Sequence, residues 1–151
     1  MRVYIDTSVI NGLLADDAPD IQEKTKRFFG RVRGHEFEVY ISGTVIAEIE
    51  ATSDLDRLAE LISILEMYPF QVLEVTEDAL QLTHDYLVRG IIPLRSRADA
   101  MHIALASVHR IEALVSWNFK HIVKHKTRIL ANAVNGQKGY GQVDFCTPEE
   151  I

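Results

Sequence analysis

The feature that most constrains the fold of this chain is a regular alternation of short apolar segments with longer segments of helical periodicity. Runs rich in β-branched and aromatic residues lie at positions 2–5, 38–42, 70–75, 112–116 and 143–148. Between them, apolar residues recur every three to four positions, over residues 7–15, 21–32, 44–51, 55–66, 77–90, 96–110 and 126–141. Strands that alternate with helices are typical of parallel sheets covered on both faces. The sequence therefore predicts an α/β fold, a three-layer α/β/α sandwich around a mainly parallel sheet of about five strands.

The composition is that of one ordinary globular domain. The chain has 151 residues, of which 47% are apolar and 25% charged, without an internal repeat or a linker-like tract. Cys146 is the only cysteine, which favours a reducing, cytoplasmic setting. The N-terminal segment lacks the features of a secretion signal, and no run approaches the roughly 18 apolar residues of a membrane span. We expect a single soluble domain over residues 1–151 that has no membrane partner.

The charge is unevenly distributed along the chain. The net charge is −6, yet residues 113–143 hold no acidic residue and carry a charge of +5, from Lys120, Lys124, Lys126, Arg128 and Lys138. Lys and Arg drive binding to the phosphates of nucleic acids. A solvated basic helix face without a partner would give the same pattern, and the sequence leaves both interpretations open.

Polar residues stand where the predicted strands end. Asp6 follows the first strand, and Ser116 and Asn118 lie at the end of the fourth. Glu48 lies in the helix after the second strand, and Asp99 in the helix before the fourth. Because doubly wound folds bind ligands outside the carboxyl ends of their strands, these five residues are candidates for one site.

Three of these candidates also have purely structural interpretations. Asp6 is well suited to cap the helix that follows it, although Thr7 and Ser8 compete for that position. Glu48 borders the buried face of its helix, and a solvated glutamate would fit there. Asn118 could be the N-cap of the short segment that follows it.

Asp99 and His102 lie on one face of a helix built of small residues. For Asp99 the structural alternative is a capping box with Ser96, three residues earlier, in which aspartate replaces the usual Glu or Gln. His102, one turn further on, is interpreted as a packed or hydrogen-bonded histidine in preference to a metal ligand.

Several carboxylates at one edge of a sheet call for a cation, because like charges at close range disfavour ionisation. Carboxylate and amide oxygens suit Mg²⁺ or Mn²⁺. Such ions keep several waters and take one or two carboxylates each, together with substrate phosphate. The pattern therefore favours a hard divalent ion at this edge.

The chain as a whole resembles the PIN-domain family, and VapC-type toxins within it. The resemblance rests on motifs that occur in this order: Asp6-Thr7-Ser8, Glu48, Asp99 within ADAMHIALA, Ser116-Trp117-Asn118 and the closing CTPEE. It implies a three-layer α/β/α fold, a metal-dependent ribonuclease and, for many members, the toxin of a toxin–antitoxin pair. An antitoxin partner and a homodimer are implied in the same way.

The resemblance also assigns roles to individual positions. Asp6, Glu48 and Asp99 match the acidic metal-site residues of the family, and Ser8 and Ser116 match its hydroxyl positions. Asn118 departs from the pattern, because many members have a fourth acid there. An amide oxygen lacks the charge that helps to retain a second ion.

The expected reaction is hydrolysis of an RNA phosphodiester by a metal-activated water. Asp6 and Asp99 would be the main ligands, and Glu48 would bind a second ion or orient the water. Asn118 and Ser116 would position water or phosphate at the rim of the site.

The RNA backbone would lie along the basic window, with Lys120 and Lys124 as its closest contacts. Two alternatives to this activity are an inactive PIN-like module that binds RNA or protein, and a phosphatase with Asp6 as nucleophile. The second alternative lacks the DxDxT pattern.

Overall fold

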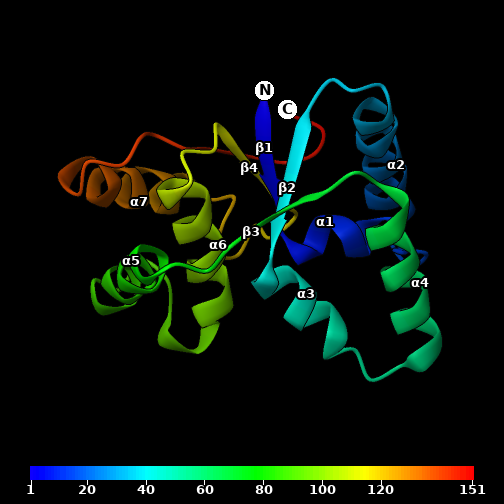
Figure 1. Ribbon diagram of the computed structural model, residues 1–151, viewed down its shortest axis with the longest axis horizontal. Coiled ribbons are helices and arrows are strands. Elements are labelled where there is room, and N and C mark those ends of the chain that lie inside the picture. Colours follow the sequence, from blue (N-terminus) through cyan, green and yellow to red (C-terminus); the bar gives the residue numbers. More distant parts are fainter.

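A five-stranded sheet forms the centre of the structure, a computed structural model that describes residues 1–151 (Figure 1). The strands are β1 (Arg2–Ile5), β2 (Glu38–Ser42), β3 (Gln71–Leu73), β4 (Ala113–Val115) and β5 (Asp144–Cys146). They lie in the order β3-β2-β1-β4-β5, and every neighbouring pair is parallel. The α/β class and the five-stranded parallel sheet predicted from the sequence are confirmed.

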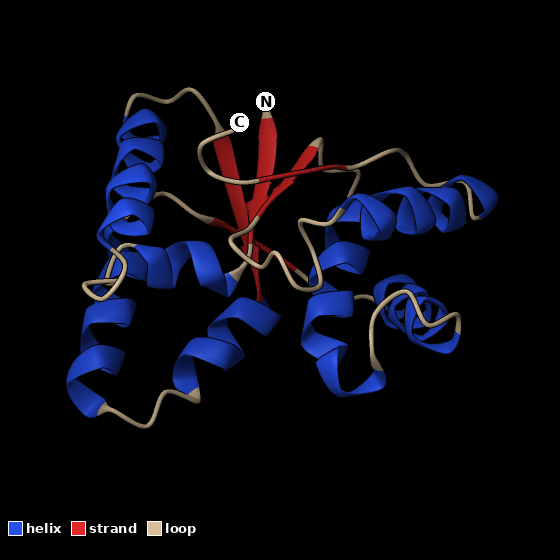
Figure 2. Ribbon diagram, turned by 180° about the vertical axis from the view of Figure 1, so that it is seen from behind, coloured by secondary structure: helices blue, strands red, loops and turns tan.

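Helices cover both faces of the sheet. They are α1 (Thr7–Gly12), α2 (Pro19–Arg33), α3 (Gly43–Glu50), α4 (Leu55–Met67), α5 (Glu77–Val88), α6 (Arg97–Val108) and α7 (His125–Gln137), with a 3₁₀ turn η1 (Leu94–Ser96). The chain moves from β1 outward to β3, then returns past β1 to β4 and β5. Crossovers between parallel strands are right-handed. Because the chain adds strands first in one direction from β1 and then in the other, α1 to α4 lie on one face of the sheet and α5 to α7 on the other face, as Figures 1 and 2 show.

The central strand β1 explains the apolar start of the sequence. Val3, Tyr4 and Ile5 are completely buried, because β1 pairs with β2 on one side and β4 on the other and is covered on both faces. The connections that leave β2 and β4 run to opposite faces of the sheet. The crevice that this reversal opens lies at the carboxyl ends of β1 and β4, where ligands bind in folds of this kind.

Several predicted elements are too long. The strand predicted at 70–75 is reduced to Gln71–Leu73 at one edge of the sheet, where Val72 is 54% exposed. The helix predicted at 7–15 ends at Gly12, whereas the segment 126–141 is, as expected, a helix that passes into a Gly-rich turn, ending at Gln137 before Gly139 with its φ of 80°. No helix is both long and apolar enough to cross a membrane.

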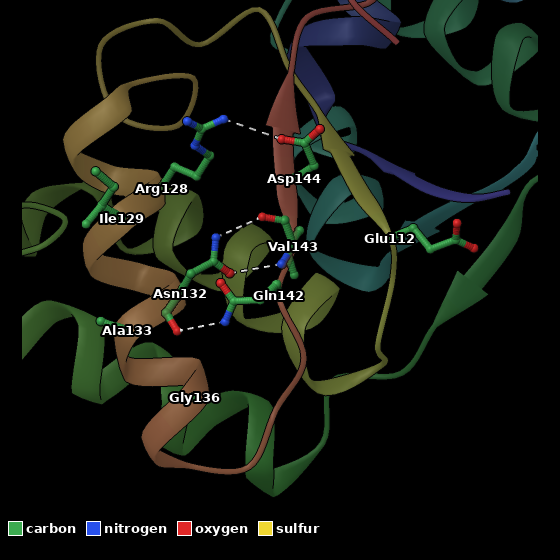
Figure 3. A pocket seen from close by; sticks show the side chains of 9 residues that line it. All are labelled: Glu112, Arg128, Ile129, Asn132, Ala133, Gly136, Gln142, Val143 and Asp144. Carbon is green, nitrogen blue, oxygen red and sulfur yellow. Dashed lines mark hydrogen bonds and ion pairs between the residues drawn. The ribbon is translucent and has the colours of Figure 1, made fainter.

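The other edge strand, β5, is held by a side chain of α7 (Figure 3). The Asn132 amide donates to the Val143 carbonyl, and the Val143 N–H donates to Asn132 Oδ1, both at 2.9 Å. A cavity of about 660 Å³ opens between α7 and β5, with Arg128 paired to Asp144 at 3.6 Å on its wall. The largest cavity therefore does not include Asp6, Glu48 or Asp99.

Candidate active site

Asp6 is the best-fixed side chain at the crevice. It lies directly after β1, is 3% exposed, and both of its carboxylate oxygens accept hydrogen bonds. Ser8 donates to Oδ1, and Ser116, which follows β4, donates to Oδ2 at 2.6 Å. Backbone N–H groups of Trp117 and Asn118 in turn donate to the two serine hydroxyls, each at 2.9 Å. Two neighbouring strands thus hold one carboxylate in a single orientation.

The capping interpretation of Asp6 is wrong. Asp6 occupies the N-cap position of α1, but its side chain makes no capping hydrogen bond. Burial raises the pKa of Asp6, while His102 and the hydrogen bonds from Ser116 and Ser8 lower it in part, and the charge of Glu48 adds to the rise. Because burial disfavours the charged form of Asp6, we infer that this carboxylate has a role other than capping α1.

Ser116 lies elsewhere than expected. It is completely buried, and its hydroxyl donates to Asp6 and accepts from the Asn118 N–H. Ser116 therefore does not stand at the rim of the site to position water or phosphate. It fixes the Asp6 carboxylate, as Ser8 does from the first turn of α1.

Glu48 reaches the crevice from α3 and is also held by hydrogen bonds. Its Oε1 accepts from the Thr7 hydroxyl at 2.8 Å and meets His102 Nε2 at 2.6 Å. Burial alone would raise the pKa of Glu48, but the hydrogen bond and charge of His102, helped by Thr7, outweigh burial and lower it. The interpretation of Glu48 as a free, solvated side chain is wrong. Its second oxygen, Oε2, makes no hydrogen bond within the protein.

His102 belongs to a buried chain of hydrogen bonds that the sequence did not reveal. Its Nδ1 lies 2.6 Å from the Tyr4 hydroxyl, which lies 2.8 Å from Ser42 Oγ. Because a carboxylate only accepts, His102 Nε2 donates to Glu48, and the Tyr4 and Ser42 hydroxyls continue the chain from Nδ1. The expectation of a hydrogen-bonded histidine is confirmed, with partners from β1 and the end of β2.

Asp99 lies in the first turn of α6, half-buried. Burial raises its pKa, and the Asn118 amide, His102 and His121 lower it in part. The capping box with Ser96 is not formed, because the Ser96 side chain makes no cap hydrogen bond. Asp99 is therefore free to face the crevice from the opposite side of the sheet to Glu48.

Asn118 is a turn residue. Its Oδ1 accepts the His121 N–H at 2.9 Å, and its carbonyl accepts from Ile122 and Val123. The capping interpretation is thus right in kind, although residues 119–123 form turns and not a helix. Because Oδ1 already serves the backbone, Asn118 offers the site its amide N–H groups, as the contact with Asp99 indicates.

The three carboxylates do not form a closed metal cage. No group of three or more His, Cys, Asp or Glu side chains is arranged to hold an ion by itself. The donor set nevertheless suits Mg²⁺ or Mn²⁺, which bind through one or two carboxylates and several waters. Free lone pairs remain on Asp6, on Asp99 and on Glu48 Oε2, and burial leaves Asp6 and Asp99 with raised pKa values that a cation would lower.

Lys120 and Lys124 lie beyond Asn118, in the turn that leads to α7. Both are exposed. They line a cavity of about 270 Å³ together with Lys126 and Thr127 of α7. The first three lysines of the basic window, Lys120, Lys124 and Lys126, therefore lie next to the acidic crevice.

Comparison with known proteins agrees with this geometry. Residues 3–120 match the family model of the PIN domain. The chain belongs to the PIN-domain family. No curated protein sequence matches the chain.

Solved structures of the same fold come from VapC and VapBC proteins. VapBC2 from Rickettsia felis, bound to a DNA fragment from its promoter, has a TM-score of 0.59 and 10% identity, covering 97% of this chain and 98% of that one. Mycobacterium tuberculosis VapC20, described as a sarcin-ricin loop cleaving toxin, has a TM-score of 0.60 and 18% identity, with coverages of 79% and 92%. VapBC-1 from nontypeable Haemophilus influenzae has a TM-score of 0.57 and 14% identity, with 98% of both chains covered.

Proposed function

We propose that this protein is a metal-dependent endoribonuclease and the toxin of a type II toxin–antitoxin pair. The observation that carries the proposal is the double clamp on Asp6, whose carboxylate oxygens accept from Ser8 and Ser116 at the crevice. Two further carboxylates, Glu48 and Asp99, approach the same end of the sheet from helices on opposite faces. Membership of the PIN-domain family supports the same chemistry.

Mg²⁺ or Mn²⁺ would be held by Asp6 and Asp99, and when bound it would lower the pKa of water and stabilise charge on the phosphoryl oxygens. Ser8 and Ser116 keep the Asp6 oxygens in a fixed direction. Thr7 and His102 hold Oε1 of Glu48, which leaves Oε2 free to orient the attacking water or to share a second ion.

Two protein partners complete the proposal. Two structures that share this fold are described as a toxin–antitoxin complex, from Klebsiella pneumoniae, and as a member of the VapBC family of toxin–antitoxin systems, VapBC-5 from Mycobacterium tuberculosis. By analogy this chain would bind a cognate antitoxin and form a homodimer in the cytoplasm.

A second candidate is an inactive PIN-like module that binds RNA or protein. It is favoured by Asn118, whose Oδ1 accepts the His121 N–H and is withdrawn from the crevice. The fourth oxygen that would help to retain a second ion is therefore missing.

RNA cleavage with Mg²⁺ or Mn²⁺ separates the two candidates. We expect wild-type protein to cleave single-stranded RNA, and Asp6→Asn and Asp99→Asn to reduce the rate roughly 100-fold or more, because they remove the ligands of the ion. EDTA should abolish cleavage. A small aryl phosphate should remain intact, which distinguishes the nuclease from a phosphatase.

Asn118→Asp is the informative further variant. If wild type cleaves no RNA in either metal while Asn118→Asp does, the natural protein is the binding module and the proposal of an active nuclease fails. If both cleave, Asn118 is compatible with catalysis.

A further inference from the structure

The cavity next to the crevice is lined by cations and by no acidic side chain. Its charged residues are Lys120, Lys124 and Lys126, and His121 and Thr127 contribute further polar groups. We refer to it as the basic cavity. The loop after α5, with Gly90 and Pro93, forms its opposite wall.

None of the three lysines is in an ion pair. The paired lysines of the chain lie elsewhere, as Lys24 does with Asp20 and Glu149. Three ammonium groups around one cavity repel each other unless an anion lies between them. The electrostatic potential in the cavity is therefore positive. This arrangement is suited to a ligand with more than one anionic oxygen.

The first turn of α7 also points its positive end into the basic cavity. Lys124 is the N-cap and provides no side-chain cap, and the first turn contains no acidic residue. The backbone N–H groups of such a turn bind anions in many proteins.

Thr127 adds an independent sign of a ligand. It is 4% exposed, lines the basic cavity, and its hydroxyl makes no hydrogen bond within the protein. The hydroxyl oxygen is not fully enclosed by the protein, so a ligand in the cavity can reach it. A phosphate oxygen in the cavity would accept from this hydroxyl.

The basic cavity starts where the acidic crevice ends. His121, on the wall of the cavity, donates its backbone N–H to Asn118 Oδ1 at the crevice, at 2.9 Å. We propose that the basic cavity seats an RNA backbone phosphate that flanks the phosphate to be cleaved. The inference rests on the proposed ribonuclease function and adds to it a fixed second subsite, which would set the register of the strand in the crevice.

Inorganic phosphate tests the subsite without any need for activity. In ¹⁵N spectra we expect phosphate, added at constant ionic strength, to shift the amides of Lys126 and Thr127 in a saturable way. The shifts should be reduced in Thr127→Val, which keeps the shape of the side chain and removes the donor. Shifts that are absent, or that chloride reproduces, would overturn the subsite.

RNA with single methylphosphonate linkages tests whether the phosphate is that of the substrate. In an Asp6→Asn background, which leaves RNA uncut, Lys124→Ala combined with Lys126→Ala should weaken RNA binding about tenfold and reduce the salt slope by about 1. Lys26→Ala, an exposed and unpaired lysine on α2, is the matched control and should leave binding unchanged.

The neutral linkage identifies the seated phosphate. A methylphosphonate at one position next to the cleavage site should weaken RNA binding to the Asp6→Asn protein. The same methylphosphonate should not weaken binding further when Lys124→Ala and Lys126→Ala are also present. If a methylphosphonate weakens RNA binding equally at every position, the lysines attract the RNA backbone without seating any one phosphate, and there is no subsite. Tighter binding of an acidic peptide than of RNA at the same amides would assign the cavity to a protein partner instead. If phosphate binds while RNA is never cut, the proposed function fails and the anion site stands.

Discussion

Three carboxylates at one edge of the sheet have three different surroundings. Asp6 is buried between two hydroxyls, Glu48 shares one oxygen between Thr7 and His102, and Asp99 is half-buried without such a pair. Their pKa values consequently move in different directions, upward for Asp6 and Asp99 and downward for Glu48. Ionisation of the carboxyl group therefore lowers the free energy of unfolding at Asp6 and Asp99 and raises it at Glu48.

We predict that Asp99→Asn raises and Glu48→Gln lowers the free energy of unfolding at pH 7. Asp99 has a raised pKa in the folded protein, so its ionisation costs stability as pH rises above its ordinary value of 3.8. Glu48 has a lowered pKa, so its stabilisation is present above 4.5 and is lost as pH falls through the folded value. The loss in Glu48→Gln should be about 1 kcal/mol, since Glu48 is partly exposed.

Urea unfolding of wild type and both variants between pH 3 and pH 7 measures these effects. Both differences should shrink as the pH falls, because Asp99 becomes protonated in both states and Glu48 becomes protonated as the pH passes through its lowered pKa. If Asp99→Asn is less stable than wild type at pH 7, the raised pKa of Asp99 is not the dominant effect.

The acidic candidates could be predicted from sequence because each follows a recognisable strand or lies on a recognisable helix face. Their partners could not, since Ser116 lies 110 positions from Asp6 and His102 lies 54 from Glu48. The direction of the Asn118 amide depends on a turn that has no periodic pattern. Thr7 was visible beside Asp6, but only the placement of α3 gives it a partner.

At the scale of elements, α1 and α2 meet at a glycine. A Cβ atom on Gly12 would lie 2.6 Å from Thr25 Oγ1 and 3.2 Å from Trp117 Nε1. Those two atoms are already joined by a hydrogen bond of 2.9 Å, and the Thr25 hydroxyl donates to the Ile21 carbonyl. Glycine is therefore required here for close approach.

We predict that Gly12→Ala destabilises the protein by about 1–3 kcal/mol, although alanine is the better helix former. Gly30→Ala is the matched control, because Gly30 lies within α2 and no atom lies within 4 Å of its added Cβ. That substitution should stabilise by about 0.5–1 kcal/mol. Thermal unfolding measures both, and a stabilising Gly12→Ala would mean that α1 and α2 can separate without cost.

The order and type of the elements followed from periodicity, whereas their lengths did not. Central β1 matches its predicted range, because burial on both faces requires an apolar run at Val3, Tyr4 and Ile5. Edge strand β3 is shorter than its apolar run, since its last ladder pair is at Leu73 and Val75, beyond it, is exposed. Periodicity reports which face is buried, and pairing at an edge depends on a neighbour that sequence does not specify.

At the scale of the whole molecule, the N-terminal strand holds both halves together. β1 pairs with β2, which follows it, and with β4, which lies more than 100 residues later. The buried apolar residues of both helical layers form one continuous cluster of 37 residues. Neither half of the chain can complete its core without the other.

We therefore predict a single cooperative unfolding transition for the protein. Fluorescence of Trp117, the only tryptophan, reports on the contact between β4 and α2. Far-UV circular dichroism reports on all helices, including α5 to α7 on the other face. The two midpoints in urea should coincide, as two-state unfolding requires. Separate midpoints would mean that the layers are independent units.

The pair of hydrogen bonds between Asn132 and Val143 also affects how copies of this protein meet at high concentration. An exposed sheet edge is a template on which a second chain can add a strand. At Val143, directly before β5, the Asn132 amide already takes the place of such a strand, donating to the backbone carbonyl and accepting from the N–H. A second chain would have to displace the Asn132 side chain before it could form its first hydrogen bond to this edge. The edge is therefore protected against strand addition and aggregation between copies of the protein.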